Sequence, residues 1–345
     1  MLKVGVIGCG KISQVRHLPE YAANPEVKIA ALFDLNAERA QTLALQYGAK
    51  TYAAYGELLN DPEIDAVSVC TSNDSHADIT CAALAAGKHV LCEKPMATTL
   101  KDCERMVEAA RAYGKILMID QNQRLAGAHV KARELIRAGA IGKPLTFRTS
   151  FRHAGPETWS IEPGAGTWFF DRKRAVMGAM ADLGIHKTDL IQYLLGQTVV
   201  ETRATLTTLD KRLADGSLIG VDDNAICIYT MSDGAVGTMA ASWTDYGAED
   251  NSTVIYGTRG VLRIYDDRAH TLILEPKGGK AEFFDVDEIQ TNENQTRSGV
   301  IDLFVQAVND PAVEGISGAS VLPAMRAVFA SIESSDTGKA VRTDR

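Results

Sequence analysis

Short apolar runs alternate with helix-like segments along the first 120 residues. The runs have the length and composition of buried strands and cover Val4–Ile7, Lys28–Phe33, Ala66–Cys70, His89–Cys92 and Ile116–Ile119. Between them, apolar residues recur every three or four positions in Ala37–Tyr47, Ala77–Ala86 and Leu100–Tyr113. This spacing is typical of helices that bury one face. Strands that alternate with helices predict a doubly wound parallel sheet covered on both faces.

A different pattern follows a helical stretch at Lys131–Ala138. Alternating runs separated by glycine-containing turns predict hairpin-linked strands. These strands are Thr146–His153, Val199–Leu209, Asn224–Thr230, Val236–Trp243, Ser252–Tyr256, Val261–Asp266, Thr271–Glu275 and Ala281–Val286, with helices at Asp182–Leu195, Gly299–Val308 and Ala319–Ser331. We therefore expect two domains, 1–123 and 124–345, the second an α+β domain with a large, mostly antiparallel open sheet. The polar tail Lys339–Arg345 is expected to fray.

Composition narrows the class of protein. The 345 residues are 46% hydrophobic and 23% charged, as in ordinary globular proteins, and the net charge of −8 argues against a nucleic-acid partner. No apolar run approaches the length of a membrane span. The six cysteines form no C-x-x-C pair, and the strand-like start at Leu2 does not resemble a secretory leader. We expect a cytoplasmic protein that is not bound to a membrane.

A glycine-rich turn comes directly after the first predicted strand, as Gly8-Cys-Gly10-Lys11-Ile12-Ser13. Gly8 permits a tight turn, and Gly10 lets the backbone approach a pyrophosphate. Ser13 is small enough for the following helix to pack closely against the strand, and the pyrophosphate would bind the amides at the start of that helix. The segment predicts a Rossmann-type dinucleotide site to which Lys11 and Ile12 also contribute.

Asp34 ends the second predicted strand, where a carboxylate can accept two hydrogen bonds from an adenine ribose. It would also repel a 2′-phosphate. Asp34 therefore favours NAD over NADP. Arg39 lies a few residues downstream and could hold a phosphate, but a solvated place on the helix surface is the simpler interpretation.

Polar residues also follow two later strands of the predicted parallel sheet. Thr71, Asn73 and His76 come after the strand at 66–70, and Glu93-Lys94-Pro95 follows the strand at 89–92. Ligands bind at the carboxyl ends of such strands. Taken alone, Asn73 could simply form an Asx turn, His76 could begin a helix, and Glu93 with Lys94 could be a solvated ion pair of little consequence.

Together with Asp182-Leu-Gly-Ile-His186, these motifs resemble the glucose–fructose oxidoreductase, inositol dehydrogenase and MocA (Gfo/Idh/MocA) family. The likeness runs through nearly the whole chain in order and spacing, and the E-K-P tripeptide with a later D-x-x-x-H is its specific part. The resemblance implies an NAD-dependent oxidoreductase. Such an enzyme would transfer a hydride between nicotinamide and a secondary hydroxyl or ketone of a sugar, inositol or sugar derivative.

The resemblance also implies a catalytic set. Lys94 is similar to the family lysine that binds the reacting oxygen, and as a cation it would stabilise a developing alkoxide. Asp182 and His186 are four residues apart, hence on one face of a helix. A neutral histidine is suited to accept a hydroxyl proton. Asp182 could orient that imidazole or hydrogen-bond a neighbouring hydroxyl of the substrate. Whether Lys94 or His186 is the immediate acid or base stays open.

Further residues are carried over from the family or from their place in the chain. Asn122 begins a stretch similar to one that approaches the nicotinamide, and Arg152, His153, Trp159 and Trp168 are expected to line the sugar pocket. Aromatic rings pack against the apolar faces of sugars, although a buried tryptophan is more commonly part of a core.

The chain departs from the family at two neighbouring places. The usual glycine-rich approach to the D-x-x-x-H helix is Val176-Met-Gly-Ala-Met-Ala181 here, and the basic run Arg172-Lys-Arg174 precedes it. A solvated loop is the favoured interpretation of that run, and recognition of a charged group on the substrate is the alternative.

Two other functions remain compatible with the sequence. One is a redox-neutral, glycoside-cleaving enzyme that retains NAD and works through a 3-keto intermediate. The other is a sugar-responsive sensor, which the presence of both Lys94 and His186 disfavours. The seven histidines show no metal-ligand spacing, so no metal is expected. By analogy with similar second domains, whose sheets pack face to face, we expect a homodimer or homotetramer.

Overall fold

The computed structural model describes residues 1–286 and 297–344 and contains two sheets. The first sheet has six parallel strands in the order β3-β2-β1-β4-β5-β6. Its strands are β1 (Leu2–Ile7), β2 (Val27–Phe33), β3 (Lys50–Thr51), β4 (Ala66–Val69), β5 (His89–Cys92) and β6 (Leu117–Ile119). The strand order reverses between β1 and β4, which is the point where open parallel sheets bind ligands. The predicted doubly wound α/β sheet is confirmed.

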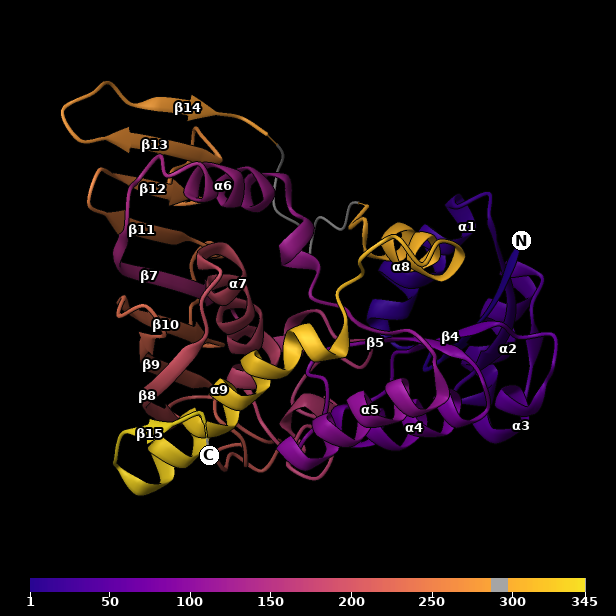
Figure 1. Cartoon of the computed structure of the whole chain (residues 1–345). Helices are drawn as coiled ribbons and strands as arrows, with labels where there is room; N and C mark the ends of the chain where they lie inside the picture. The colour runs from indigo at the N-terminus through magenta and orange to yellow at the C-terminus, as the bar shows by residue number, and fades with distance from the viewer. Residues whose placement is uncertain (287–296, 345) are drawn as a thin grey trace.

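Helices cover both faces of this sheet. The elements between its strands are a π-helical turn η1 (Ser13–His17), α1 (Leu18–Ala23), α2 (Ala37–Tyr47), α3 (Tyr55–Asn60), the 3-10 turn η2 (Asn73–Ser75), α4 (His76–Ala85) and α5 (Leu100–Tyr113). Helices α4 and α5 lie side by side on one face, and α1 lies on the other face with α8 (Val300–Asn309) (Figure 1).

Local sequence signals determine where the helices begin and end. The Asn36 side chain accepts a hydrogen bond from the Arg39 amide at the start of α2, and the Thr99 side chain caps α5 in the same way. Both helices end at a glycine in the left-handed region, Gly48 at φ 67° and Gly114 at φ 61°. Both helices therefore begin and end at the predicted residues.

The second sheet has nine strands in the order β14-β13-β12-β11-β7-β10-β9-β8-β15. They are β7 (Pro144–Arg152), β8 (Val199–Thr207), β9 (Asn224–Met231), β10 (Val236–Ser242), β11 (Thr253–Gly257), β12 (Gly260–Ile264), β13 (Leu272–Pro276), β14 (Glu282–Phe284) and β15 (Val341–Arg342). β7 and β10 pair in parallel, whereas the remaining pairs are antiparallel. The prediction of a mostly antiparallel open sheet is confirmed.

The expectation that the tail 339–345 frays is wrong over β15. Val341 pairs with Thr202 at the edge of the sheet and is 3% exposed, because its apolar side chain enters the core. One buried residue in a polar segment gives little sequence signal.

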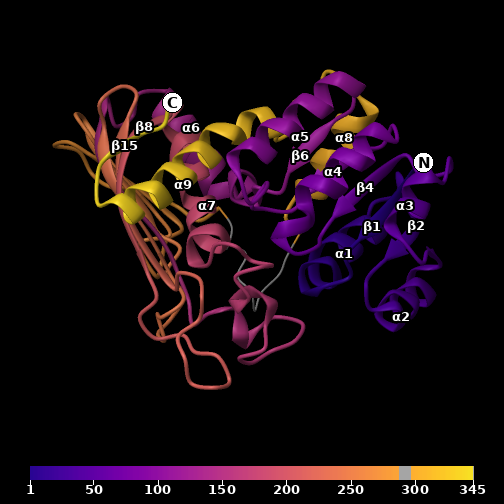
Figure 2. The ribbon, with the colours of Figure 1, turned by 90° about the horizontal axis from the view of Figure 1, so that it is seen from below.

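Helices cover one face of the second sheet. They are α6 (Gly127–Arg137), α7 (Ile185–Leu195) and α9 (Gly318–Thr337), which lie between the two sheets in the edge-on view of Figure 2. The opposite face of the sheet carries no helix of the described part of the chain. Among the described residues, no helix is both long and apolar enough to cross a membrane.

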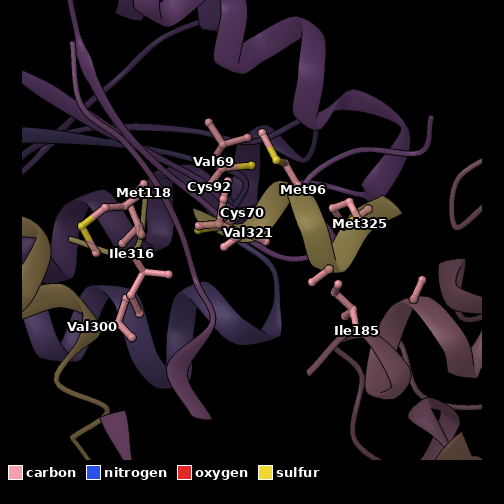
Figure 3. Close-up of a cluster of buried hydrophobic side chains, with 14 of the residues drawn as sticks. Val69, Cys70, Cys92, Met96, Met118, Ile185, Val300, Ile316, Val321 and Met325 are labelled. Carbon is pink, nitrogen blue, oxygen red and sulfur yellow. The ribbon is translucent and has the colours of Figure 1, made fainter. Parts of the chain in front are cut away.

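The chain returns to the first sheet after the second is complete. The Ile119 amide donates to the Ile316 carbonyl, and Met118 forms an isolated bridge with Ser317. Figure 3 shows Met118 beside Ile316 and Val300 in the resulting apolar cluster. Because α8 and α9 carry the C-terminal part of the chain back onto the first sheet, the division into 1–123 and 124–345 stays a prediction.

Candidate active site

A cavity of about 690 Å³ lies between the two halves of the chain, at the carboxyl ends of the first sheet. Most residues expected from the sequence line it. These are Gly8, Gly10, Lys11, Ile12, Asp34, Thr71, Asn73, Glu93, Lys94, Asn122, His153, Trp159, Trp168, Asp182 and His186. Their cofactor and substrate roles remain predictions, but the fold does bring them into one space.

His76 and Arg152 do not line the cavity. The His76 ring is 1% exposed, with one nitrogen 2.8 Å from the Pro95 carbonyl and the other 3.1 Å from the Thr71 carbonyl. The His76 ring thus connects the loops that follow β4 and β5. Burial lowers the pKa of His76 below its usual value. The Arg152 backbone pairs with Asp250 at the end of β7. His76 therefore supports the cavity from behind its wall, and the expectation that Arg152 lines the sugar pocket is wrong because its side chain is not part of the lining.

The glycine turn has the shape expected of a dinucleotide cradle. Gly8 has φ +96°, and a Cβ there would lie 2.5 Å from the Cys70 carbonyl oxygen. A Cβ on Gly10 would meet nothing within 4 Å, because that side of the turn faces open space. Ser13 is fully buried at the start of η1. These features fit a bound pyrophosphate.

Asp34 holds the next loop through its carboxylate. One oxygen accepts from the Cys9 amide and the other from the Asn36 amide, each at 2.7 Å. Arg39 also lines the cavity, with Nη1 3.5 Å from Asp34 Oδ1. The interpretation of Arg39 as a solvated surface residue is therefore wrong, because the helix turns it toward Asp34.

Lys94 and Asp182 form an ion pair across the cavity. Lys94 Nζ donates to Asp182 Oδ1 at 2.8 Å and to the Asp182 backbone carbonyl at 2.9 Å. The other Asp182 oxygen accepts from Trp243 Nε1 at 3.0 Å. Burial by itself would raise the pKa of Asp182, but Lys94 and His153 lower it below its usual value. Asp182 is therefore a carboxylate that orients the Lys94 ammonium.

His186 lies on the same wall as a buried, neutral base. Burial, reinforced by the Lys94 charge, lowers the pKa of His186 well below its usual value. Its Nδ1 is buried and has no hydrogen-bond partner within residues 1–286 and 297–344. The His186 imidazole is therefore neutral, the form in which a histidine can act as a proton acceptor.

The segment that carries Asp182 is a π-helical turn, η6 (Met180–Gly184), directly before α7. The sequence predicted one helix from Asp182 onward. Asp222 holds the turn, since its carboxylate accepts from the Gly178 and Met180 amides at 2.8 Å each. Sequence reasoning missed both Asp222 and Trp243, because neither lies near a recognisable motif.

A buried charged cluster lies behind Glu93. His17 Nε2 is 2.9 Å from Glu93 Oε1, and Asp120 Oδ2 is 3.6 Å from both His17 and Arg16. Burial opposes a charge on His17, but Cys70, Asp120 and Glu93 raise its pKa well above the usual value. Burial by itself would raise the pKa of Asp120, but the positive charges of Arg16 and His17 lower it below its usual value.

His17, Glu93 and Asp120 have side chains of the kind that bind metals, and the tertiary structure brings the three together. Their spacing along the chain does not match any metal-binding motif. Arg16 already supplies positive charge at this place. The cluster is explained as a balanced set of ion pairs that fixes Glu93, whose second oxygen accepts from the Lys94 amide at 3.2 Å. The absence of a metal stays a prediction.

An aromatic wall faces these groups from the 3-10 turn η5 (Trp168–Phe170). Trp168 stacks on Phe169 with ring centroids 4.0 Å apart, and Trp159 contacts Phe169 edge-on at 5.4 Å. Trp159 Nε1 and His153 Nε2 are buried without a hydrogen-bond partner in the described structure, and His153 Nε2 lies 4.0 Å from Asp182 Oδ2. Flat apolar rings beside unused polar atoms suit a hydroxylated ring.

Only one residue of the basic run 172–174 lines the cavity. Arg174 lines the cavity and lies 5.8 Å from the Trp168 ring, whereas Arg172 and Lys173 do not line it. All three side chains are nevertheless exposed, as the favoured interpretation of a solvated loop requires, although backbone bonds dock this loop onto η2. The Arg174 carbonyl accepts from the Asp74 amide, and the Ala175 carbonyl accepts from the Asn73 side chain.

Comparisons with known proteins agree with this geometry. Residues 2–121 match the model of an oxidoreductase family with an NAD-binding Rossmann fold, and residues 129–263 match the GFO/IDH/MocA C-terminal domain. The chain is 29% identical over 280 residues to myo-inositol 2-dehydrogenase of Thermotoga maritima, covering 81% of this chain and 79% of the relative. It is 30% identical to levoglucosan dehydrogenase of Pseudarthrobacter phenanthrenivorans, covering 76% and 73%.

Solved structures give the same result. A levoglucosan dehydrogenase in complex with NADH and L-sorbose superposes with a TM-score of 0.87 at 26% identity, covering 99% of both chains. The aldose-aldose oxidoreductase of Caulobacter crescentus, complexed with glycerol, gives 0.82 at 25% identity and also covers 99% of both chains. The protein therefore belongs to the Gfo/Idh/MocA family of NAD-binding oxidoreductases.

Proposed function

We propose that the enzyme transfers a hydride between NAD and a secondary hydroxyl or ketone of a sugar, an inositol or a sugar derivative. The observation that carries this proposal is the placement of Lys94, Asp182 and His186 between the glycine turn and the aromatic wall. Relatives named for inositol and levoglucosan support the substrate class.

The hydrogen bonds of Lys94 support a division of labour in the oxidation. An ammonium has three N–H donors, and Lys94 spends two on Asp182, which leaves the third for the substrate oxygen. The neutral His186 accepts the hydroxyl proton while the C–H electron pair leaves as hydride. NAD, when bound, is the acceptor of that hydride. Lys94 then stabilises the negative charge that develops on the oxygen.

The aromatic wall and the unused polar atoms support binding of a hydroxylated ring. Trp168 and Phe169 offer a flat apolar surface, and His153 and Trp159 offer nitrogens that have no hydrogen-bond partner in the described residues. Burial of Asp182 and His186 keeps bulk water from the reacting groups, which strengthens each electrostatic interaction there.

A panel of inositols, aldoses, anhydrosugars and glycosides, offered with NAD, tests the proposal. We expect at least one free polyol or sugar to give NADH absorbance, and His186→Asn to abolish it. Release of an aglycone from glycosides without NADH accumulating, and without oxidation of any free sugar, would replace it with the redox-neutral cleavage. If no compound turns over while NAD still binds, the proposed activity is wrong.

The open face of the second sheet supports a homo-oligomer. Ile226 and Ile228 on β9 and Val236 on β10 point to this face and are 54%, 48% and 40% exposed. A second copy of the chain would bury such a face, since two identical flat surfaces can pack about a twofold axis. We propose a homodimer or homotetramer built on it.

Ile228→Glu is expected to reduce the mass of the oligomer, because it places a charge in the proposed interface. Light scattering coupled to size exclusion measures the change. Leu45→Glu is the matched control, since Leu45 is 87% exposed on α2, away from this sheet. A wild-type monomer, or an oligomer that both variants leave intact, would refute the proposed interface.

The state of the cysteines supports the proposed location in the reducing cytoplasm. All six are free, and five of them are buried. Burial raises the pKa of the Cys92 thiol and of the Cys103 thiol, which makes both of them unreactive.

A further inference from the structure

A segment of the second half of the chain reaches the adenosine end of the cavity. Residues 159–162, which follow the 3-10 turn η4 (Pro156–Thr158), line the same cavity as Asp34 and Arg39. Arg39 Nη2 donates to Glu162 Oε1 at 3.0 Å. The dinucleotide cleft therefore has a wall at this end that the glycine turn and its sheet do not provide.

The contact places one cation between two carboxylates. Arg39 Nη1 lies 3.5 Å from Asp34 Oδ1, and Arg39 Nη2 lies 3.0 Å from Glu162 Oε1. The Arg39 side chain is 20% exposed and the Glu162 side chain is 70% exposed, so their contact lies at the solvent edge of the cavity. The three groups together carry one net negative charge, and the guanidinium is already engaged on two sides.

An arginine at this position of a dinucleotide fold is the group that would otherwise accept a 2′-phosphate. A phosphate on the ribose would have to displace Glu162 from Arg39 and would also approach the Asp34 carboxylate. The ribose hydroxyls of NAD carry no charge, so NAD does not meet this repulsion. The charges of these residues therefore disfavour binding of NADP relative to NAD.

The short loop that carries Glu162 is held in place by contacts of its own. Ser160 Oγ donates to the Glu162 carbonyl at 2.9 Å, and the Gly164 amide donates to the Glu157 carbonyl at 2.9 Å. Trp159 anchors the loop on Phe169 of the aromatic wall. Because its backbone is fixed, the Glu162 side chain reaches Arg39 at a small cost in entropy.

We propose that Glu162 is a cofactor-specificity residue that sets the preference for NAD over NADP by engaging Arg39. Asp34 excludes the phosphate from within the dinucleotide-binding fold. Glu162 excludes the phosphate from outside that fold. Because Glu162 engages Arg39, this arginine no longer favours NADP and instead forms part of an NAD site.

Calorimetric titration of the purified protein with NAD⁺ and with NADP⁺ tests the proposal without any substrate. Glu162→Gln keeps the shape and removes the charge, and we expect it to tighten NADP⁺ binding about fivefold, the scale of an exposed charge pair. NAD⁺ affinity should change less than about twofold. The gain should shrink at high salt, since exposed charges are screened.

Two further variants make the result decisive. Glu38→Gln removes the same charge from an exposed position next to Arg39 and should leave NADP⁺ affinity nearly unchanged. In an Arg39→Ala background, Glu162→Gln should give no gain, because Glu162 acts through Arg39. Equal effects of Glu162→Gln and Glu38→Gln, a gain that persists without Arg39, or an unchanged NADP⁺ affinity would each overturn the proposal.

Discussion

Lys94→Met is expected to lower kcat/KM for substrate oxidation by about 10³-fold, the cost of removing a charged donor from a developing oxyanion. The substitution keeps an unbranched side chain that is one atom shorter and removes its charge. It also leaves the Asp182 carboxylate buried beside His153 without its main partner, so the pKa of Asp182 should rise. Steady-state kinetics with NAD and a substrate from the panel measures the loss.

The matched control is Lys101→Met, which makes the same change at an exposed position of α5. Thermal unfolding and NAD titration of both variants separate a lost catalytic group from a lost fold. We expect Lys94→Met to stay folded and to bind NAD within about threefold of the wild type. Equal kcat/KM values for the two variants would show that Lys94 is not the group that contacts the reacting oxygen.

Gly178→Ala should be the most damaging small substitution in the chain. A Cβ at this position would lie 1.8 Å from the Asp222 carbonyl oxygen, a backbone atom that cannot turn away. The loop 178–180 must then separate from Asp222, which breaks the two hydrogen bonds that hold the start of η6. We expect the free energy of unfolding to fall by about 3 kcal/mol, at the upper end for overpacking. Urea denaturation measures this change.

The same variant should lose most of its activity even under conditions where it remains folded, because Asp182 and Lys94 depend on the position of η6. Gly166→Ala serves as the control, since a Cβ on Gly166 would meet nothing within 4 Å. We expect that control to stay within about 0.5 kcal/mol of the wild type. Similar unfolding curves for both variants would show that the loop yields and that Asp222 does not position η6.

Several parts of the protein follow from local sequence alone. The strand β5 at His89–Cys92 and the helix α2 at Ala37–Tyr47 begin and end where apolar runs and capping residues predict. The cofactor turn and Asp34 could be placed because they follow directly after strands. The carboxyl ends of parallel strands share one edge of the sheet, so Asp34 and Lys94 are expected to face the same side of it, and both line the cavity.

The E-K-P and D-x-x-x-H motifs identified the family, and the structure brings their residues together. Lys94 and Asp182 are 88 residues apart, yet they form an ion pair. No spacing rule predicts that contact. The sequence pointed Asp182 toward His186 or a substrate hydroxyl, whereas in the structure Asp182 occupies two donors of Lys94.

Other features were decided by the tertiary structure alone. Trp243 and Asp222 reach η6 from β-strand loops, Asp120 joins His17 behind Glu93, and Glu162 joins Arg39 across the cavity. Each of these partners lies in a different part of the chain from the residue that it contacts.

The physical reason is the range of the forces involved. Helix periodicity, capping and turn geometry depend on residues only a few positions apart. They can therefore be predicted from the local sequence. Burial, charge pairing and the shift of a pKa depend on which distant side chains share a low-dielectric space. The sequence by itself determined the elements, the dinucleotide turn and the preference suggested by Asp34. Only the tertiary structure decided which charges surround Lys94, His186 and Arg39.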